Sequence, residues 1–264
     1  MTDASAGPVA EAVGGPSSQV RAVVFDFYGT LARMVEPLPP DHRAIFERRG
    51  LTAQAARWGD QWAVGPGEGE EHTAHSVSEA AYTGWERDRL RRRARACGVP
   101  DAALDGLVEE IDHAMKALRL RLYDEVLAVL AGLRGAGLLV GVCSNWFWDL
   151  EECLTEVGVG AAVDVVVGSA RAGARKPHPL IYRTLLDRCG LPPGQVLFVG
   201  DMWEPDVRGP LAAGMSAAHL CRADPAVRGS RPPLPAGAAR IRSLTELGEL
   251  PGLRGLPGLR GLAN

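Results

Sequence analysis

The chain has 264 residues, of which 46% are hydrophobic and 23% are charged, with a formal net charge of -3 and a pI of about 6.1. This length can bury a full core, either as one large domain or as a core with a smaller insertion. The slight acidity gives no electrostatic reason to expect a nucleic-acid partner. No apolar run approaches the roughly 18 residues of a membrane span, so we expect no membrane segment.

The N-terminal sequence and the cysteines indicate a cytoplasmic protein. The segment MTDASAGPVAEAVGGPSSQ contains acidic side chains and no basic region ahead of an apolar stretch, unlike a secretory signal. The five cysteines are scattered along the chain and are never spaced C-x-x-C. A disulfide framework or a zinc site is therefore not expected, and a reducing cytoplasm is the natural location.

From residue 20 onward, short apolar runs alternate with stretches of helical spacing. The run from Val23 to Phe25 predicts a strand buried on both faces, which ends at Asp26. The alternation favours an α/β fold with a doubly wound, Rossmann-like parallel sheet as its core. The later predicted strands cover residues 138–145, 162–168, 195–201 and 217–221, and the predicted helices cover 124–135, 146–158, 180–190 and 206–214.

Residues 34–121 interrupt this alternation and contain no convincing strand. Helical spacing recurs at 41–49, 76–97 and 101–121, which predicts an inserted α-helical domain. The α/β core would then consist of the remaining residues between 20 and 245, that is 20–33 and 122–245.

Both ends of the chain have the composition of tails. Residues 1–19 are rich in Ala, Gly, Pro and Ser, which predicts a flexible segment. Residues 246–264 contain the sequence LPGLRG twice. Because Gly and Pro at this density oppose a regular helix, we expect a loosely docked or disordered end.

Polar side chains follow the predicted strands at their carboxyl ends, where open α/β sheets bind ligands. Asp26 ends the first strand, Ser144 and Asn145 end the second, and Asp201 ends the fourth. Lys176 lies in the loop after the third strand. Each residue alone could be a helix cap or a solvated charge. Together, at successive strand ends of one sheet, they indicate a site.

This set of side chains suits phosphoryl transfer through an aspartyl intermediate on a small phosphorylated metabolite. A carboxylate nucleophile such as Asp26 splits hydrolysis into two easier steps. Asp201 and Asp206 offer the carboxylate oxygens that Mg²⁺ takes alongside waters and a substrate phosphate. Lys176 and the hydroxyl of Ser144 would neutralise and hydrogen-bond the phosphoryl oxygens, where charge accumulates.

With its motifs in this order, the chain resembles the haloacid dehalogenase superfamily of hydrolases. The resemblance extends from about residue 20 to residue 245, and the helical insertion is placed like the type 1 cap of that family. A type 1 cap closes over the site and selects the substrate. The matching motifs are DFYGT (26–30), Ser144 in VCSN, Lys176 in RKPHP and GDMWEPD (200–206).

The resemblance implies a role for each matched residue. Asp26 would be the nucleophile, Ser144 a phosphate ligand, and Lys176 would hold the charges of the nucleophile and the phosphate together. Asn145 and Trp146, which directly follow Ser144, are candidate substrate contacts. The implied Mg²⁺ ligands are the carboxylates of Asp26, Asp201 and Asp206 and the backbone carbonyl of Tyr28.

Tyr28 departs from the pattern of the phosphatases in this family. They have a second Asp at this position, which protonates the leaving oxygen and then activates water. A tyrosine, whose pKa is normally near 10, is a poor base at neutral pH. Hydrolysis is therefore expected to be slower by about 10²–10⁴-fold unless another residue substitutes for the missing carboxylate. Turnover would then be slow, restricted to good leaving groups, or absent.

Two alternatives stay open. Dehalogenases of the family carry Asp-x-Tyr-Gly-Thr, often have Ser-Asn at the second motif, and need no metal. They use an arginine early in the cap to accept halide, for which Arg57 is the candidate here. They typically lack the Gly-Asp found at 200–201, which favours the Mg²⁺-dependent phosphatase. The other alternative is a binding protein that has lost efficient turnover, with Tyr28 as its sign.

Overall fold

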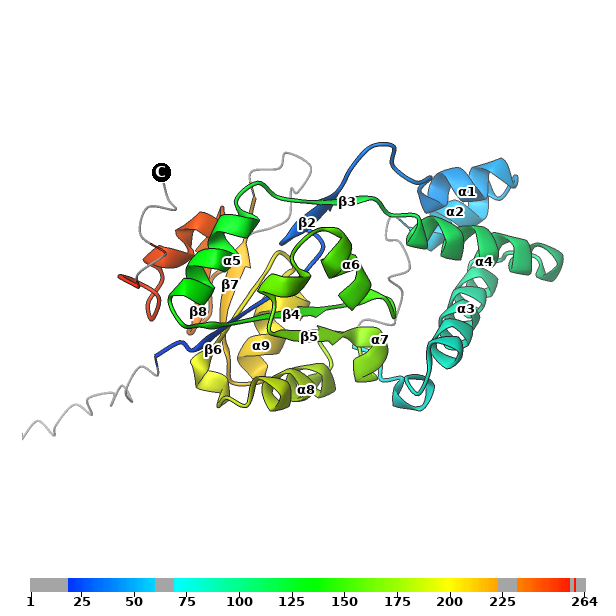
Figure 1. The fold of residues 1–264 in the computed structure, drawn as a ribbon. Helices are drawn as coiled ribbons and strands as arrows, with labels where there is room; N and C mark the ends of the chain where they lie inside the picture. Colours follow the sequence, from blue (N-terminus) through cyan, green and yellow to red (C-terminus); the bar gives the residue numbers. More distant parts are fainter. Residues whose placement is uncertain (1–18, 60–68, 223–231, 257–258, 260–264) are drawn as a thin grey trace, which may run out of the picture.

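The computed structural model describes residues 19–59, 69–222, 232–256 and 259. A six-stranded parallel sheet lies at its centre, with strand order β5-β4-β1-β6-β7-β8 (Figure 1). The doubly wound α/β fold predicted from the sequence is thereby confirmed. The strands of the sheet are β1 (Ala22–Phe25), β4 (Leu139–Ser144), β5 (Val165–Gly168), β6 (Val196–Gly200), β7 (Ser216–Leu220) and β8 (Ala238–Ile241).

Helices cover both faces of this sheet, and β1 shows how the sequence divides between them. Val23 and Phe25 pack in one apolar cluster with α5 and α6, whereas Ala22 and Val24 pack in another with α8. All four side chains are fully buried, as the continuous apolar run predicts for a central parallel strand. The helices of the core are α5 (Val126–Gly135), α6 (Leu150–Glu156), α7 (Ser169–Ala172), α8 (Pro179–Cys189) and α9 (Gly209–Ala212).

The strand order places a crevice at the carboxyl end of β1. From β1 the chain continues to β4 and β5 on one side, and then crosses to β6, β7 and β8 on the other. The loops that leave β1 and β6 therefore diverge. Such a switch point is where open α/β sheets bind their ligands.

Between β2 and β3, the described residues contain four α-helices that share an apolar cluster of their own, and this unit is here called the helical insertion (Figure 1). Buried residues from all four helices, such as Phe46, Trp58, Leu90 and Leu107, share this cluster. An inserted helical unit was expected from the spacing of the apolar residues. Its helices are α1 (His42–Arg48), α2 (Thr52–Trp58), α3 (Glu79–Ala96) and α4 (Asp101–Lys116).

Short strands join the helical insertion to the core. β2 (Ala32–Met34) pairs antiparallel with β3 (Leu120–Leu122), with Ala32 opposite Leu122. The expectation that residues 34–121 contain no strand is therefore wrong at the end of that range. Three residues are too short a stretch to display the two-residue period from which a strand is predicted.

The C-terminal part of the chain is more ordered than its composition suggests. β8 adds a sixth strand that was not predicted, and the 3₁₀ helix Leu244–Glu249 follows, capped by Ser243 and Glu246. Leu253 and Leu259, one from each LPGLRG repeat, are buried in the larger core cluster. The described part of this end is thus docked on the core, because the repeat delivers a leucine to it every six residues.

Three helix boundaries differ clearly from the prediction. The helical stretch expected over residues 101–121 ends at Lys116, ahead of β3. The helix expected from residue 146 begins only at Leu150, so residues 145–149 form a loop after β4. The helix expected from residue 206 begins with a π-helical turn, Glu204–Arg208. Across the described residues, every helix is too short or too polar to cross a bilayer.

Candidate active site

Three strand ends meet at the crevice beside β1. Asp26 directly follows β1, and its N–H donates to the carbonyl of Val199 in β6 at 2.9 Å. Ser144 is the last residue of β4, and Asp201 directly follows β6. The parallel register therefore brings side chains that are far apart in the sequence to one edge of the sheet, as the motifs predicted.

The ammonium group of Lys176 lies at the centre of this cluster. It donates to Asp26 Oδ1 at 2.8 Å, to Asp206 Oδ1 at 2.6 Å and to the carbonyl of Cys143 at 2.9 Å. The side chain is almost fully buried. Burial alone would lower the pKa of Lys176, but the carboxylates of Asp206 and Asp26 outweigh it and raise that pKa. Lys176 is therefore a permanent positive charge between two carboxylates.

Asn145 fixes the loop that carries Lys176. Its side-chain amide donates to the carbonyl of Lys176 at 2.9 Å, and its carbonyl oxygen accepts from the Lys176 N–H at 2.6 Å. Both polar ends of the amide are thus used by the backbone of Lys176. The sequence suggested Asn145 as a substrate contact, whereas its bonds in the structure hold a neighbouring loop in place.

The two oxygens of the Asp26 carboxylate have different surroundings. Oδ1 accepts from the hydroxyl of Ser144 at 2.9 Å and from Lys176 at 2.8 Å. Within the described residues, no donor is hydrogen-bonded to Oδ2. One oxygen is therefore anchored by two donors, and the other is available to a ligand.

Asp26, Asp201 and Asp206 form a cluster of carboxylates whose oxygens lie within 4.8 Å of one another. Asp201 Oδ1 accepts from the hydroxyl of Thr30 at 3.2 Å, and Asp206 Oδ2 accepts from the N–H of Met202 at 3.0 Å. These bonds orient both carboxylates, and their donors lie in the loops that follow β1 and β6.

Two glycines leave room for these carboxylates. A Cβ at Gly200 would lie 2.4 Å from the carboxyl carbon of Asp206, and one at Gly29 would lie 2.6 Å from Asp201 Oδ2. Gly29 also has φ of +90°, which side chains disfavour. Gly29 of DFYGT and Gly200 of GDMWEPD are thus required because any side chain there would collide with a carboxylate.

The cluster contains three carboxylates and one ammonium group, which leaves it an excess of negative charge. Burial, together with the charges of Asp26 and Asp206, raises the pKa of Asp201 from 3.8 to about 7. Burial likewise raises the pKa of Asp206 to about 6, in spite of the bond from Lys176. A hard divalent cation with oxygen ligands matches this donor set, because it would neutralise the excess.

We expect Mg²⁺ to stabilise the protein much more near pH 8 than near pH 5. An acid whose pKa is raised by folding stabilises the fold fully below its unfolded pKa, and this contribution is lost as the pH rises through the folded value, here about 7 for Asp201. The Tm of the metal-free protein should therefore be lower at pH 8 than at pH 5. Mg²⁺ should raise the Tm at pH 8 but not at pH 5. An Asp201→Asn variant should lack most of this pH-dependent Mg²⁺ effect; a Tm gain from Mg²⁺ that is equal at both pH values would contradict the expectation.

Tyr28 lies next to the carboxylates but does not have the properties of a base. Burial and the proximity of Tyr123 and Asp201 raise the pKa of its phenol above 10. The phenol is therefore protonated at neutral pH. Its side chain remains 41% exposed, so the chain places a partly open, neutral side chain where family phosphatases have a carboxylate.

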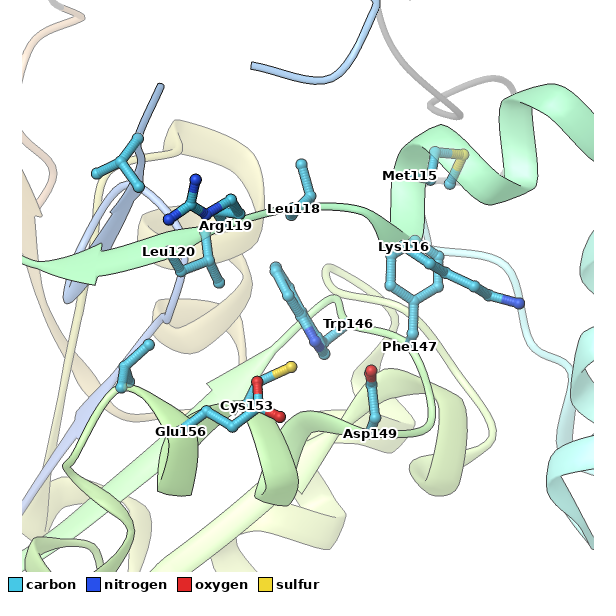
Figure 2. A pocket seen from close by; sticks show the side chains of 12 residues that line it. Met115, Lys116, Leu118, Arg119, Leu120, Trp146, Phe147, Asp149, Cys153 and Glu156 are labelled. Carbon is cyan, nitrogen blue, oxygen red and sulfur yellow. The ribbon is translucent and has the colours of Figure 1, made fainter. Parts of the chain in front are cut away.

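Trp146 lines a cavity of about 300 Å³ between the β4–α6 loop and residues 115–120, which lead from the helical insertion back to the core (Figure 2). Its indole packs edge-on against Phe27, with ring centroids 5.1 Å apart. Phe147 and Asp149 of the same loop complete this wall. The lining of this cavity includes neither Lys176 nor the three carboxylates of the cluster, so a substrate contact of Trp146 stays a prediction.

Arg57 does not join the cluster. Its guanidinium donates to the carbonyl of Cys97 at 3.1 Å, at the end of α3, so it ties two helices of the insertion together. A halide-binding role had been considered for it because of its position early in the insertion. Sequence distance gave no information on which way this side chain points.

Sequence reasoning missed three contributors to the cluster. Thr30 holds Asp201, the N–H of Met202 holds Asp206, and the carbonyl of Cys143 accepts from Lys176. The threonine was visible as the last residue of DFYGT, whereas nothing in a sequence marks a backbone carbonyl as an acceptor.

Comparison with known proteins shows which family has a sequence similar to this chain. A profile of the family described as haloacid dehalogenase-like hydrolase matches residues 20–214. The human haloacid dehalogenase-like hydrolase domain-containing protein 3 is 28% identical over 255 residues, which cover 89% of this chain and 98% of that protein. The phosphoserine phosphatase of Thermus thermophilus is 33% identical over 166 residues, which cover 62% of this chain and 63% of that protein.

Solved structures share the fold. A phosphatase of this superfamily from Thermococcus onnurineus superposes with a TM-score of 0.56 at 24% identity, covering 87% of this chain and 97% of that chain. The L-2-haloacid dehalogenase of Xanthobacter autotrophicus gives a TM-score of 0.56 at 22% identity, covering 90% of this chain and 99% of that one. Phosphatases and dehalogenases are thus equally similar in fold, so the fold does not distinguish the two reactions.

Proposed function

Because the chain belongs to the haloacid dehalogenase-like hydrolase family, we propose that it is a Mg²⁺-dependent phosphatase that hydrolyses a small phosphorylated metabolite through an aspartyl phosphate on Asp26. The observation that carries the proposal is the buried cluster of Asp26, Asp201 and Asp206 around Lys176. Asp201, in the Gly-Asp at 200–201, has no evident use in metal-free dehalogenation. The names of similar proteins also support it: phosphoserine, glyceraldehyde 3-phosphate and phosphoglycolate phosphatases.

The two carboxylate oxygens of Asp26 have different roles in the first step. Ser144 and Lys176 hold Oδ1, so Oδ2 attacks phosphorus. The bond from Oδ2 to phosphorus forms, the bond from phosphorus to the ester oxygen breaks, and the leaving alkoxide takes up one proton from solvent. Water then attacks the same phosphorus, which breaks the acyl-phosphate bond, releases one proton to solvent, and returns the carboxylate of Asp26 and inorganic phosphate.

The metal would be held by the carboxylates of Asp26, Asp201 and Asp206, with the backbone carbonyl of Tyr28 as a further ligand in the adjacent turn. When bound, Mg²⁺ supplies positive charge that neutralises the phosphoryl oxygens and the surplus carboxylates. Lys176 contributes a second positive charge, which its bonds to Asp26 and Asp206 hold in place.

The helical insertion is proposed to act as the cap of this site. In this assignment residues 34–121 form the cap, and residues 20–33 and 122–245 form the core. We also propose that the protein acts in the cytoplasm. The insertion packs on the core beside the loop that follows Ser144, where Tyr82 and Trp85 of α3 share an apolar cluster with Trp148 and Ala170. Residues that approach the substrate beyond its phosphate would come from this side.

Steady-state assays with p-nitrophenyl phosphate and with 2-chloropropionate test the proposal. We expect release of p-nitrophenolate and phosphate that requires Mg²⁺ and stops in EDTA, and no release of chloride. Chloride release that persists in EDTA would instead establish the dehalogenase that Tyr28 permits. Binding of Mg²⁺ without turnover of any substrate in a broad panel of phosphorylated metabolites would establish a binding protein.

A further inference from the structure

A segment of the helical insertion pairs with the loop that carries Lys176. The N–H of His72 donates to the carbonyl of Gly173 at 2.6 Å, and the N–H of Arg175 donates to the carbonyl of Glu70 at 3.1 Å. Between these bonds, Glu71 and Ala174 form an antiparallel bridge. Residues 70–73 thus lie beside 173–175 in the manner of a short β-ladder, although about a hundred residues separate them in the sequence.

Gly173 shows how closely the two segments approach. A Cβ there would lie 2.8 Å from Thr73 Oγ1 and 3.0 Å from Thr73 Cα, so any larger residue would push the two backbones apart. Gly173 also has φ of +82°, as the residue that ends α7. Gly190, which ends α8 at φ of +62°, has no neighbour within 4 Å of the same position.

His72 anchors the segment in the helical insertion. Its side chain is only 3% exposed, its ring lies 4.4 Å from that of Trp85 between centroids, and its Nδ1 lies 3.0 Å from the hydroxyl of Ser76. Burial and the nearby charge of Arg175 lower the pKa of His72 to about 4. At pH 7 the imidazole of His72 is therefore uncharged, and it packs against the ring of Trp85.

The positive charge of Arg175 lies near two groups of the insertion. Burial raises the pKa of the Tyr82 phenol and the charge of Arg175 opposes this rise, whereas, in spite of burial, the bond from Arg89, with a smaller contribution from Arg175, lowers the pKa of Glu86. Both residues belong to α3, and Glu86 is itself held by Arg89. The residue directly before Lys176 is thus bonded to the insertion through its backbone, and its charge lies near two groups of α3.

These contacts bear on Lys176 because Lys176 is the next residue. Its ammonium must reach Asp26 and Asp206 within hydrogen-bond distance, and a displacement of about 1 Å in a reacting group can cost 10²-fold in rate. Asn145 holds the backbone of Lys176 from the core side. The opposite side of the same loop has contacts to the helical insertion.

We propose that residues 70–73 are a docking strand of the helical insertion that positions Lys176, so that the placement of the insertion and the placement of the catalytic ammonium are coupled. The effect on catalysis rests on the phosphatase function proposed above, whereas the effect on the Lys176 loop does not. His72 acts in this scheme as a positioning residue, through the docking strand.

Three variants at two histidines test the proposal by p-nitrophenyl phosphate kinetics and by hydrogen exchange of residues 174–178. His72→Ala should lower kcat by about 10- to 100-fold with little change in KM, and should speed exchange in the Lys176 loop. His72→Phe should keep kcat and exchange near the wild-type values, because a phenyl ring can replace the neutral imidazole. His75→Ala is the matched control, since His75 also packs on Trp85 but is exposed and outside the paired segment.

The results of these experiments distinguish a failure of the docking-strand proposal from a failure of the proposed phosphatase function. Wild-type exchange at 174–178 in His72→Ala would overturn the docking strand, whether or not the protein hydrolyses phosphate esters. Loss of activity in His72→Phe with wild-type exchange at 174–178 would overturn the positioning role. An inactive wild type whose His72→Ala variant still exchanges faster at 174–178 would refute the proposed function alone.

A second pair of variants approaches the same contact from the core side. Gly173→Ala should lower kcat and speed exchange of the Glu70 to Thr73 segment, because its methyl group meets Thr73. Gly190→Ala carries a similar backbone penalty at a helix end without a neighbour, so it should reduce stability but not kcat. Equal effects of the two substitutions on kcat would contradict the docking strand.

Discussion

Replacing Asp26 with Asn is expected to abolish phosphate release, with kcat falling by about 10⁶-fold as for the loss of other covalent nucleophiles. An amide oxygen can still accept the bonds from Ser144 and Lys176, but it does not attack phosphorus. The fold should survive, because the substitution keeps the size of the side chain. Steady-state phosphate release and the melting temperature of the same sample measure both effects.

An exposed aspartate provides the control for this substitution. Asp105 in α4 has a side chain that is 85% exposed and, among the described residues, forms an ion pair with Arg91, so Asp105→Asn should leave kcat unchanged. Substantial turnover in Asp26→Asn would mean that another group attacks the substrate, and the assignment of Asp26 as nucleophile would be wrong.

Replacing Tyr28 with Asp should raise kcat by about 10²–10⁴-fold for esters with poor leaving groups. The new side chain would protonate the leaving oxygen as a carboxylic acid and then activate water as the resulting carboxylate, whereas the raised pKa of Tyr28 keeps its phenol from acting as a base. The gain should be small for p-nitrophenyl phosphate in the first step, because p-nitrophenolate leaves without a proton. The burst rate with p-nitrophenyl phosphate measures the first step, and the steady-state rate with an alkyl phosphate measures the gain in kcat.

Tyr28→Phe is the control, because it removes only the hydroxyl. It should leave kcat near the wild-type value if the hydroxyl takes no part in proton transfer. A large loss in Tyr28→Phe, or no gain in Tyr28→Asp, would show that the tyrosine or another residue already performs this function.

The parts of the fold that follow from local patterns could be predicted from the sequence. The apolar run of β1 and the alternation of later strands and helices indicate a parallel sheet, and a parallel sheet places Asp26, Ser144 and Asp201 at one edge. The polar residues could be grouped before their distances were known, because each immediately followed a predicted strand or lay in the next loop.

Other features depend on contacts that a local pattern does not record. β8 is short and only partly buried, and the leucines of the LPGLRG repeat find a core surface that their Gly- and Pro-rich surroundings do not suggest. Arg57 points to the end of α3, although its place in the sequence made it a candidate for the site. The pairing of residues 70–73 with 173–175 is likewise a long-range contact without a motif.

The first milliseconds to seconds of p-nitrophenyl phosphate hydrolysis test the central claim most directly. Formation of the aspartyl phosphate needs no proton for this leaving group, whereas its hydrolysis lacks the second carboxylate. We therefore predict a burst of about one p-nitrophenolate per active site, followed by slow turnover, which requires Mg²⁺ and is absent in Asp26→Asn. A burst that is unchanged in EDTA, or the same linear release from the wild type and Asp26→Asn, would contradict a Mg²⁺-dependent phosphatase that works through Asp26.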